Sequence, residues 1–375
     1  TMSCMFNSAF KSAIIPSLSV RLVWAVRPGN INYSVMNYKI HIEPGGATFT
    51  ADPDETILDA ALREHVGLSY SCRNGLCGAC KAHVLEGEVI YEDERPEALT
   101  ESEEAEGMAL LCQAYARSDC RIEAHVAEAL AGIPIRKLPC RVTDTRQLAH
   151  DVMRLELKLP EGSNFKFLAG QYIDFLLKSG HRRSFSIANA PHDGEHLELH
   201  VRHAKGGEFT DFVFEHLETR ALLRMEGPLG SFYLREDSDR PIIFMAGGTG
   251  FAPIKGIIEH ALHIGITRPM HLYWGVRSKR DLYMHELPTR WAAEHDNITY
   301  VPVLSEPQPE DNWQGRTGYV HEAIMADFDD LSGFDIYAGG PPQMVHAGFD
   351  AFATKGLIED HYFSDSFEYA KDSKK

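Results

Sequence analysis

The sequence predicts a multidomain protein that joins a small α+β domain, an antiparallel β-barrel and an α/β domain with a doubly wound parallel sheet. Three observations lead to this fold class. The chain has 375 residues, enough for two or three domains of ordinary size. Short strands separated by turn residues fill its middle part, as in small antiparallel barrels. After residue 240 strand and helix patterns alternate, as in doubly wound sheets.

The chain divides into four segments. We expect a disordered extension at residues 1–36, because a well-patterned strand begins directly after Met36. The first domain is expected at 37–130, the second at 135–236 and the third at 240–375.

Composition limits the classes of partner. Lys and Arg number 37 and Asp and Glu number 54, so the net charge is −17. This balance argues against nucleic acid or an anionic membrane as the partner, and it favours a protein with a basic patch. No stretch reaches the roughly 18 consecutive apolar residues that a membrane span requires, so no membrane contact is expected.

The first domain opens with a predicted hairpin. Residues 38–43 alternate apolar and polar side chains, a Pro-Gly-Gly turn follows, and residues 47–50 can pair back. Thr56 and Asp59 form a capping-box pattern at the start of a helix that is expected to end at Gly67.

Four of the seven cysteines have metal-ligand spacing. Cys72, Cys77 and Cys80 lie within nine residues, and Cys112 follows. The run C-x4-C-x2-C with a distant fourth cysteine is typical of plant-type 2Fe-2S binding. A structural zinc site is the alternative, but zinc sites commonly use paired C-x2-C units and one is present here; pairwise disulfides are a second alternative. Clustered thiols indicate a reducing compartment, and we expect a cytoplasmic location.

Residues 38–125, with this cysteine loop and the Leu-Cys-Gln at 111–113, resemble a plant-type ferredoxin domain. The resemblance implies a β-grasp-like fold and ligation of the cluster by the four cysteines. Gly75 and Gly78 lie inside the loop, where they permit the sharp turns that bring three thiolates together.

The second domain contains predicted strands at 152–159, 171–177, 183–187 and 197–201. Arg183, Ser184, Phe185 and Ser186 alternate between two faces of one of them. They offer a cation, a flat apolar surface and a hydroxyl, which are the groups that a flavin requires. Further along, Gly206 and Gly207 precede a helix that starts with Glu208, Phe209 and Thr210, whose free amides and dipole can hold a pyrophosphate.

In this order and spacing, these segments resemble the flavin domain of the ferredoxin-NADP reductase family. The resemblance implies that Arg183 binds phosphate, that Phe185 lies beside the ring and that Ser186 acts as a catalytic residue at N5. It also implies that Gly206 to Thr210 contact the pyrophosphate, and that the flavin is FAD rather than FMN.

The third domain begins with a strand at 242–245, a turn made by Gly247, Gly248, Thr249 and Gly250, and a helix. The turn does not match G-x-G-x-x-G, so an ordinary dinucleotide fingerprint is not supported. It resembles the Gly-Thr-Gly-x-Ala-Pro turn of the same reductase family. Gly340 and Pro341 resemble that family's Cys-Gly-Pro-Pro element beside the nicotinamide, where Gly339 stands in place of the cysteine.

Two further segments complete the expected nucleotide and flavin sites. Arg277 and Ser278 lie where this family distinguishes adenosine phosphates; we expect NADH as the donor, with NADPH as the alternative. The resemblance also implies that Phe367, near the carboxyl end, covers the flavin and belongs to the catalytic residues. The alternative is a tail residue packed on the core.

The resemblance covers residues 38–370, and the order of the domains matches the reductase components of multicomponent oxygenases and the CDP-6-deoxyglucoseen reductases. It implies that electrons pass from NADH through FAD and the 2Fe-2S cluster to an oxygenase or dehydratase component. A redox-sensing protein that stores electrons without turnover is the alternative from another class, and a free-flavin reductase is a second enzymatic alternative.

Overall fold

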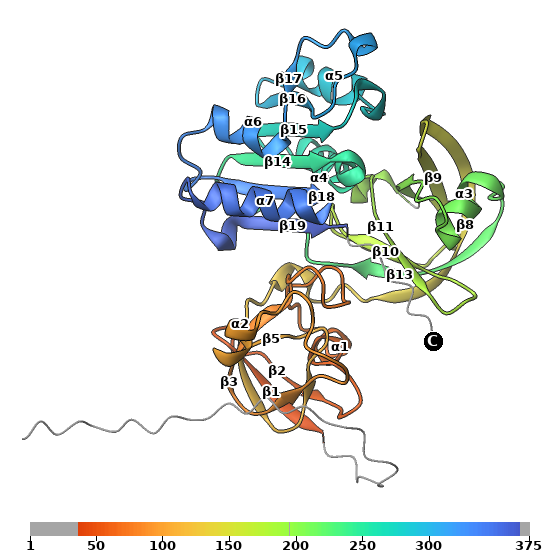
Figure 1. Cartoon of the computed structure of the whole chain (residues 1–375). Helices are drawn as coiled ribbons and strands as arrows, with labels where there is room; N and C mark the ends of the chain where they lie inside the picture. The colour runs from red at the N-terminus through yellow and green to blue at the C-terminus, as the bar shows by residue number, and fades with distance from the viewer. Residues whose placement is uncertain (1–36, 195, 368–375) are drawn as a thin grey trace, which may run out of the picture.

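The computed structural model describes residues 37–194 and 196–367, and it forms three bodies (Figure 1). The amino-terminal body lies below the other two, the middle part of the chain forms the body at the right, and the carboxyl-terminal part forms the α/β body above. The predicted disordered extension at 1–36 lies outside the described residues. Among the described residues, no helix combines the length and the apolar character that crossing a membrane requires.

The amino-terminal body has a five-stranded mixed sheet in the order β2-β1-β7-β3-β5. The predicted hairpin is confirmed: β1 and β2 are antiparallel, with residue 38 opposite residue 51. β1 also pairs with β7 in parallel. Its strands and helices are β1 (Tyr38–Glu43), β2 (Thr48–Ala51), α1 (Ile57–Arg63), β3 (Lys81–Glu86), α2 (Glu101–Ala105), β5 (Met108–Leu110) and β7 (Cys120–Glu123), with the small pair β4 (Val89–Ile90) and β6 (Tyr115–Ala116).

Helix α1 starts where the sequence predicts and ends earlier. The Thr56 hydroxyl accepts a hydrogen bond from the amide of Asp59 at 3.1 Å, which satisfies one free donor of the first turn. The helix ends at Arg63 instead of reaching Gly67. His65 adopts a left-handed φ of 58°, and this conformation cannot continue an α-helix.

The middle body is a six-stranded antiparallel sheet in the order β11-β10-β13-β8-β9-β12. Strands β11 and β12 form the two edges of this sheet, and in the described residues they share no ladder. One isolated bridge, between Ile187 and Leu199, links the two edges. The sequence predicts a barrel here; the described residues form an antiparallel sheet, and no closed barrel is found among them. The elements are β8 (Arg136–Ala149), β9 (Val152–Lys158), β10 (Tyr172–Leu176), β11 (Arg182–Ser186), β12 (His196–Arg202), α3 (Glu208–Glu215) and β13 (Leu222–Leu229).

The carboxyl-terminal body has a six-stranded parallel sheet in the order β17-β16-β15-β14-β18-β19. Side chains of the central strand alternate between two separate cores: Ile242, Phe244 and Ala246 pack with α4 and α5, and Ile243 and Met245 pack with α6 and α7. Helices on both faces confirm the doubly wound prediction. The elements are β14 (Ile242–Gly247), α4 (Phe251–His263), β15 (Met270–Val276), α5 (Glu286–Glu294), β16 (Ile298–Leu304), β17 (Arg316–Thr317), α6 (Val320–Asp327), β18 (Asp335–Gly340), α7 (Pro342–Ala353) and β19 (Tyr362–Ser366).

Six short 3-10 helices occupy connections: η1 (Glu128–Leu130), η2 (Pro191–Asp193), η3 (Gly248–Gly250), η4 (Lys279–Asp281), η5 (Pro309–Asp311) and η6 (Glu359–His361) among the described residues.

The amino-terminal and middle bodies share a hydrophobic core. Tyr172 and Leu229, from β10 and β13 of the middle body, belong to the buried cluster of the amino-terminal body. The backbone pairs across the same contact, because the amide of Ser231 donates to the Tyr70 carbonyl at 2.9 Å and the amide of Tyr70 donates to the Ser231 hydroxyl at 2.9 Å. The cysteine loop that follows Tyr70 is therefore held against the middle body.

Candidate active site

A cavity of about 980 Å³ lies where the three bodies meet. The amino-terminal body contributes Ser71, Cys72 and Asn74 to its wall, and the other two contribute the rest. The residues predicted from the sequence that line it are Cys72, Arg183, Ser184, Phe185, Ser186, Gly207, Phe209, Thr210, Gly247, Gly248, Thr249, Arg277, Pro341 and Phe367. The predicted residues outside this wall are Cys77, Cys80, Cys112, Gly206, Glu208, Gly250, Ser278 and Gly340.

The four candidate cluster ligands converge in two hydrogen-bonded pairs. The Cys72 thiol pairs with Cys77, and the Cys80 thiol pairs with Cys112. The hydrogen bond with Cys77, helped by backbone amides of the loop, lowers the pKa of Cys72 to about 6. Gly75 and Gly78 have φ values of 79° and 78°, the left-handed conformation that such a tight loop requires.

This donor set fits a 2Fe-2S cluster. All four thiols are unbridged, and the described chain contains no disulfide at these positions. The side-chain amide of Gln113 donates to the Cys112 sulfur at 3.9 Å, and hydrogen bonds of this kind tune the potential of thiolate-bound iron. Because Cys72 lies on the cavity wall, the predicted cluster loop reaches the predicted flavin site directly.

Strand β11 carries the four residues predicted to bind the flavin, Arg183 to Ser186, and all four line the cavity. The Ser184 hydroxyl donates at 2.6 Å to Asp174, its paired residue on the neighbouring strand β10. Burial raises the pKa of Asp174. Phe185 packs against Phe175 and Phe209 with ring centroids 5.9 and 5.3 Å apart, so an aromatic platform backs the cavity.

The start of α3 already has an anionic partner within the chain. The amide of Gly206 donates to the carboxylate of Asp211 at 3.1 Å, and the Thr210 hydroxyl donates to the Ala204 carbonyl at 2.7 Å. Glu208 pairs with His181 at the surface. Gly207 remains at the cavity wall, where a Cβ would lie 2.7 Å from the Thr210 hydroxyl. The predicted pyrophosphate contacts at Gly206 and Thr210 would therefore compete with bonds inside the chain.

Two glycine segments predicted separately lie against each other beneath the nucleotide site. A Cβ on Gly250 would lie 1.9 Å from the Gly339 carbonyl oxygen, and a Cβ on Gly340 would lie 2.8 Å from the Gly247 carbonyl oxygen. At the rim, a Cβ on Gly248 would lie 2.5 Å from the guanidinium of Arg202. Glycine at these positions lets the two turns approach each other closely. Gly247, Gly248 and Thr249 of the first turn line the cavity, where backbone at the start of a helix suits a dinucleotide phosphate, so the turn fits NAD.

Arg277 and Ser278 have different surroundings. Arg277 is exposed and lines the cavity. Ser278 is buried, and its amide and hydroxyl donate to the same oxygen of Asp281 at 2.9 and 3.0 Å. We interpret Ser278 as the cap of η4, which holds Arg277 in place.

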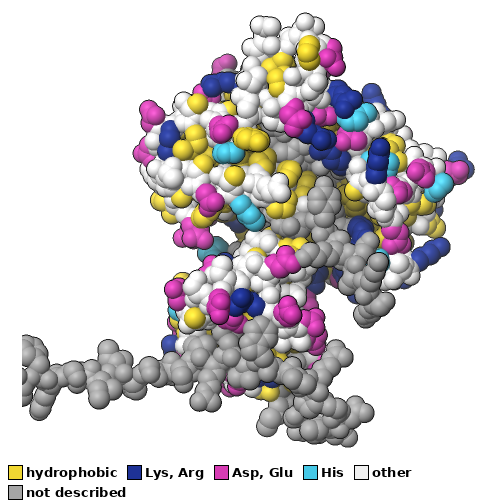
Figure 2. Space-filling model, viewed as in Figure 1, with side chains coloured by type: hydrophobic (Ala, Val, Ile, Leu, Met, Phe, Trp, Pro, Cys, Tyr) yellow, Lys and Arg dark blue, Asp and Glu magenta, His cyan; other side chains and the backbone are white. Residues whose placement is uncertain are grey.

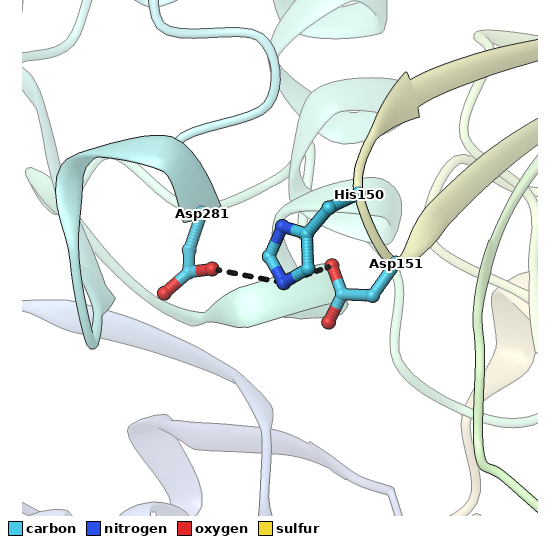
Figure 3. A group of neighbouring side chains, drawn as sticks. All are labelled: His150, Asp151 and Asp281. Carbon is cyan, nitrogen blue, oxygen red and sulfur yellow. Dashed lines mark ion pairs between the residues drawn. The ribbon is translucent and has the colours of Figure 1, made fainter.

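A His-Asp-Asp group that no sequence pattern indicates joins the middle and carboxyl-terminal bodies (Figure 3). His150 lies in the β8–β9 turn, and its Nε2 is 3.8 Å from an oxygen of Asp151 and 3.8 Å from an oxygen of Asp281. A tetrahedral metal with bonds of about 2.0–2.2 Å would need ligand atoms closer together, at roughly 3.4 Å. Asp151 also accepts a hydrogen bond from Arg202 at 2.8 Å. The group is best interpreted as ion pairing between two domains.

Asp365 is a second residue of the site that was not predicted from the sequence. This aspartate lies near the end of β19, and its carboxylate accepts hydrogen bonds from Ser186 at 2.9 Å and from Ser71 at 3.1 Å. Burial raises the pKa of Asp365 to about 6, against the opposing effect of the two hydrogen bonds. Its only sequence signal is its place two residues before Phe367.

Phe367 lies half-buried on the cavity wall. Its amide donates to the Gly340 carbonyl at 2.9 Å, which fixes the backbone beside the nucleotide turn. Both predicted alternatives, a cover for the flavin and a residue packed on the core, agree with this position.

Family models match the three bodies in order. They are described as a 2Fe-2S iron-sulfur cluster binding domain at residues 40–117, an oxidoreductase FAD-binding domain at 139–233 and an oxidoreductase NAD-binding domain at 244–348.

Curated relatives match nearly the whole length of the chain. The chain is 41% identical to the CDP-6-deoxy-L-threo-D-glycero-4-hexulose-3-dehydrase reductase of Yersinia pestis, over 90% of this chain and 99% of that protein. It is 36% identical to the phenol 2-monooxygenase reductase component DmpP of Pseudomonas, over 90% of this chain and 96% of that protein. It is 34% identical to the terephthalate 1,2-dioxygenase reductase component 1 of Comamonas, over 88% and 98% of the two chains.

Solved structures agree with these relatives. The reductase GcoB of Amycolatopsis matches with a TM-score of 0.75 and 34% identity, over 89% of this chain and all of that one. The ferredoxin reductase in carbazole 1,9a-dioxygenase matches with a TM-score of 0.66 and 29% identity, over 90% of this chain and 100% of that one.

Proposed function

Because this chain belongs to the family of NAD(P)H-dependent iron-sulfur flavoprotein reductases, we propose that it carries electrons from NADH to a separate acceptor protein. When bound, FAD takes a hydride from the nicotinamide, and the 2Fe-2S cluster then carries single electrons. The protein's task is to bind these groups close together and to exclude water from the space between them.

One observation carries this proposal: a single cavity is lined by residues of all three domains, including Cys72 of the cluster loop. Electron transfer over short distances needs this arrangement. A free-flavin reductase has no use for a cysteine loop at the wall of its flavin site.

We propose roles for the wall residues as follows. Arg183 offers a cation to the flavin phosphate, and Phe185 supports the ring from the aromatic platform with Phe175 and Phe209. Ser186 holds its hydroxyl proton toward Asp365, and this leaves its oxygen lone pairs available to the cavity. Phe367 closes the opposite side of the cavity.

For the nucleotide, the proposed contacts are Gly247 to Gly250, Arg277 and the segment at Gly340 and Pro341. The tight approach of Gly250 to Gly339 holds the two turns together, and Gly247, Gly248 and Pro341 line the cavity beside this contact. NADH is the proposed donor and NADPH the alternative. A ratio of kcat/KM values for the two nucleotides decides between them.

The acceptor that we propose is an oxygenase or dehydratase component with a basic docking face. Residues 37–130 hold nineteen acidic and seven basic side chains, so most of the chain's net charge of −17 comes from the domain of the cluster. On the face drawn in Figure 2, acidic side chains outnumber basic ones over this domain. An acidic surface around the exit point of the electrons favours a basic partner and speeds its encounter.

Two finer points also belong to this proposal. The bridge between Ile187 and Leu199 supports a partly open barrel, with Ser186 beside the joint. The six described cysteines are all free, which supports a reducing, cytoplasmic location.

The experiment mixes the purified protein with NADH under anaerobic conditions. The flavin absorbance should bleach, an electron paramagnetic resonance signal of the reduced cluster should follow, and cytochrome c should be reduced steadily. A flavin that bleaches without a cluster signal would refute the relay. Failure to turn over with cytochrome c would favour a redox-sensing protein.

A further inference from the structure

One buried carboxylate connects all three domains. Asp365 belongs to the carboxyl-terminal domain, and its two oxygens accept hydrogen bonds from Ser186 of the flavin domain and Ser71 of the cluster domain. The side chain is 6% exposed and lies on the cavity wall. The contact to Ser71 spans 294 positions of the chain.

Ser71, the hydrogen-bond partner of Asp365, lies next to a predicted ligand of the cluster. It directly precedes Cys72, and both residues line the cavity. The Ser71 carbonyl accepts a hydrogen bond from the Tyr172 hydroxyl at 2.6 Å. The peptide that leads into the cluster loop is therefore fixed from one side by the flavin domain and from the other by the nucleotide domain.

A buried carboxylate is unfavourable in free energy when the contact that it makes is purely structural. Removing an ionised group from water costs free energy, and two hydroxyl donors compensate for only part of it. No described ion pair involves Asp365, so among the described residues these two hydrogen bonds alone stabilise its ionised form. Buried ionisable groups that lose solvation free energy are common at functional sites.

We propose that Asp365 is a positioning residue that fixes the cluster loop against the flavin-facing strand β11 through Ser71 and Ser186. It thereby sets the spacing across which electrons leave the flavin site for the cluster. This inference rests on the proposed function, since it concerns the step between the two groups.

The test compares Ser71→Ala with Ser71→Thr, which keeps the hydroxyl, and with Ser102→Ala, an exposed serine of α2 in the same domain. Hydrogen–deuterium exchange of the holoprotein is measured at the amides of Tyr70 and Ser231, which bond across the domain contact. Loss of one buried hydrogen bond should speed exchange there by about fivefold in Ser71→Ala. Ser71→Thr and Ser102→Ala should behave like the unaltered protein.

Stopped-flow reduction by NADH supplies the second readout. The rate of cluster reduction, divided by the rate of flavin reduction in the same trace, should fall about fivefold or more in Ser71→Ala and recover in Ser71→Thr. In a double-mutant cycle, the effects of Ser71→Ala and Asp365→Ala should not add, because both changes remove the same hydrogen bond.

The outcomes are separable. If Ser71→Ala leaves both the exchange rates and the ratio of rates unchanged, Asp365 does not position the cluster loop. Additive effects in the cycle would also overturn the inference. If the unaltered protein fails to reduce its cluster with NADH, the proposed function itself fails, whatever the variants do.

Discussion

The hydroxyl of Tyr172 donates a hydrogen bond of 2.6 Å to the carbonyl oxygen of Ser71, across the boundary between the flavin and cluster domains. Tyr172 is buried and also fills part of the hydrophobic core of the cluster domain. One side chain therefore supplies both apolar packing and a polar anchor at this boundary.

The first prediction removes that anchor. Tyr172→Phe keeps the ring and leaves the buried Ser71 carbonyl without this donor, which should lower the free energy of unfolding by about 1–3 kcal/mol. Urea denaturation measures the change. Tyr38→Phe makes the same substitution at a half-buried tyrosine whose hydroxyl has no hydrogen bond to the described residues, and it should shift stability by less than about 0.5 kcal/mol. Equal effects of the two changes would contradict the role of the anchor.

The second prediction separates ligand cysteines from buried bystanders. Cys72→Ser removes one of the four thiolates and should abolish iron binding and the cluster signal, because serine is a poor ligand for iron-sulfur clusters. Cys140→Ser changes a cysteine that is 1% exposed and lies in the core of the flavin domain. Iron analysis should find a normal content in this control. An iron content that survives in Cys72→Ser would exclude the proposed ligand set.

The third prediction concerns acid stability. Glu198 lies on β12, where burial opposes ionisation, but hydrogen bonding by His200 and the charges of Lys255 and Arg154 lower the pKa of Glu198 to about 2. Burial lowers the pKa of His200, so this histidine donates as a neutral imidazole.

Because the folded-state pKa of Glu198 is below the unfolded value, its contribution is present above about pH 4.5 and is lost as the pH falls toward about 2. The full contribution is about 3 kcal/mol. Unfolding free energies measured across this range should fall less steeply in Glu198→Gln. Parallel curves for the two proteins would refute the assignment.

The fourth prediction concerns Gly339, which stands in place of the cysteine in the reductase Cys-Gly-Pro-Pro element that this segment resembles. A Cβ at this position would lie 2.9 Å from the Gly250 carbonyl oxygen, closer than real Cβ contacts allow. Gly339→Ala should therefore destabilise the protein by about 1–3 kcal/mol and raise the KM for NADH. At Gly333 a Cβ would meet no atom within 4 Å, so Gly333→Ala is the matched control. A normal KM and melting temperature in Gly339→Ala would show that the backbone shifts at little cost in free energy, and would contradict this prediction.

The fifth prediction uses salt. Raising the ionic strength from about 0.01 to 1 M shortens the Debye length from about 30 to 3 Å. Reduction of the basic acceptor cytochrome c should slow severalfold over this range, because the cluster domain carries the excess of acidic side chains. Flavin reduction by NADH in the same solutions is the internal reference. A cytochrome rate independent of salt would exclude steering by this surface.

Local patterns predicted much of the site. The spacing of the four cysteines, the alternation in Arg183 to Ser186 and the glycine turn after β14 each depend on neighbours in sequence, and each stands in the expected element. Strands β8 and β13 escaped prediction for a physical reason. Most of β8 is exposed or half-buried and contains Pro139, and β13 contains Gly227 and Pro228, so neither has a clear hydrophobic alternation.

Contacts between domains could not be predicted in this way. Ser71 and Asp365 are separated by 294 positions, and His150 meets Asp281 only after two domains have docked. Serine, histidine and aspartate occur throughout the surface, so no composition or spacing distinguishes these from the others. Pairing between distant positions depends on the finished packing.

The shared core of the first two domains has a consequence for the order in which the molecule is assembled. Tyr172 and Leu229 complete the interior of the cluster domain, yet the ribosome makes them long after Cys112. When the four cysteines have been synthesised, the cluster domain of the nascent chain still exposes an apolar patch, which residues made later must cover. Iron inserted during translation would therefore enter a domain whose hydrophobic core is still incomplete. The cluster domain expressed alone would expose this apolar patch to solvent.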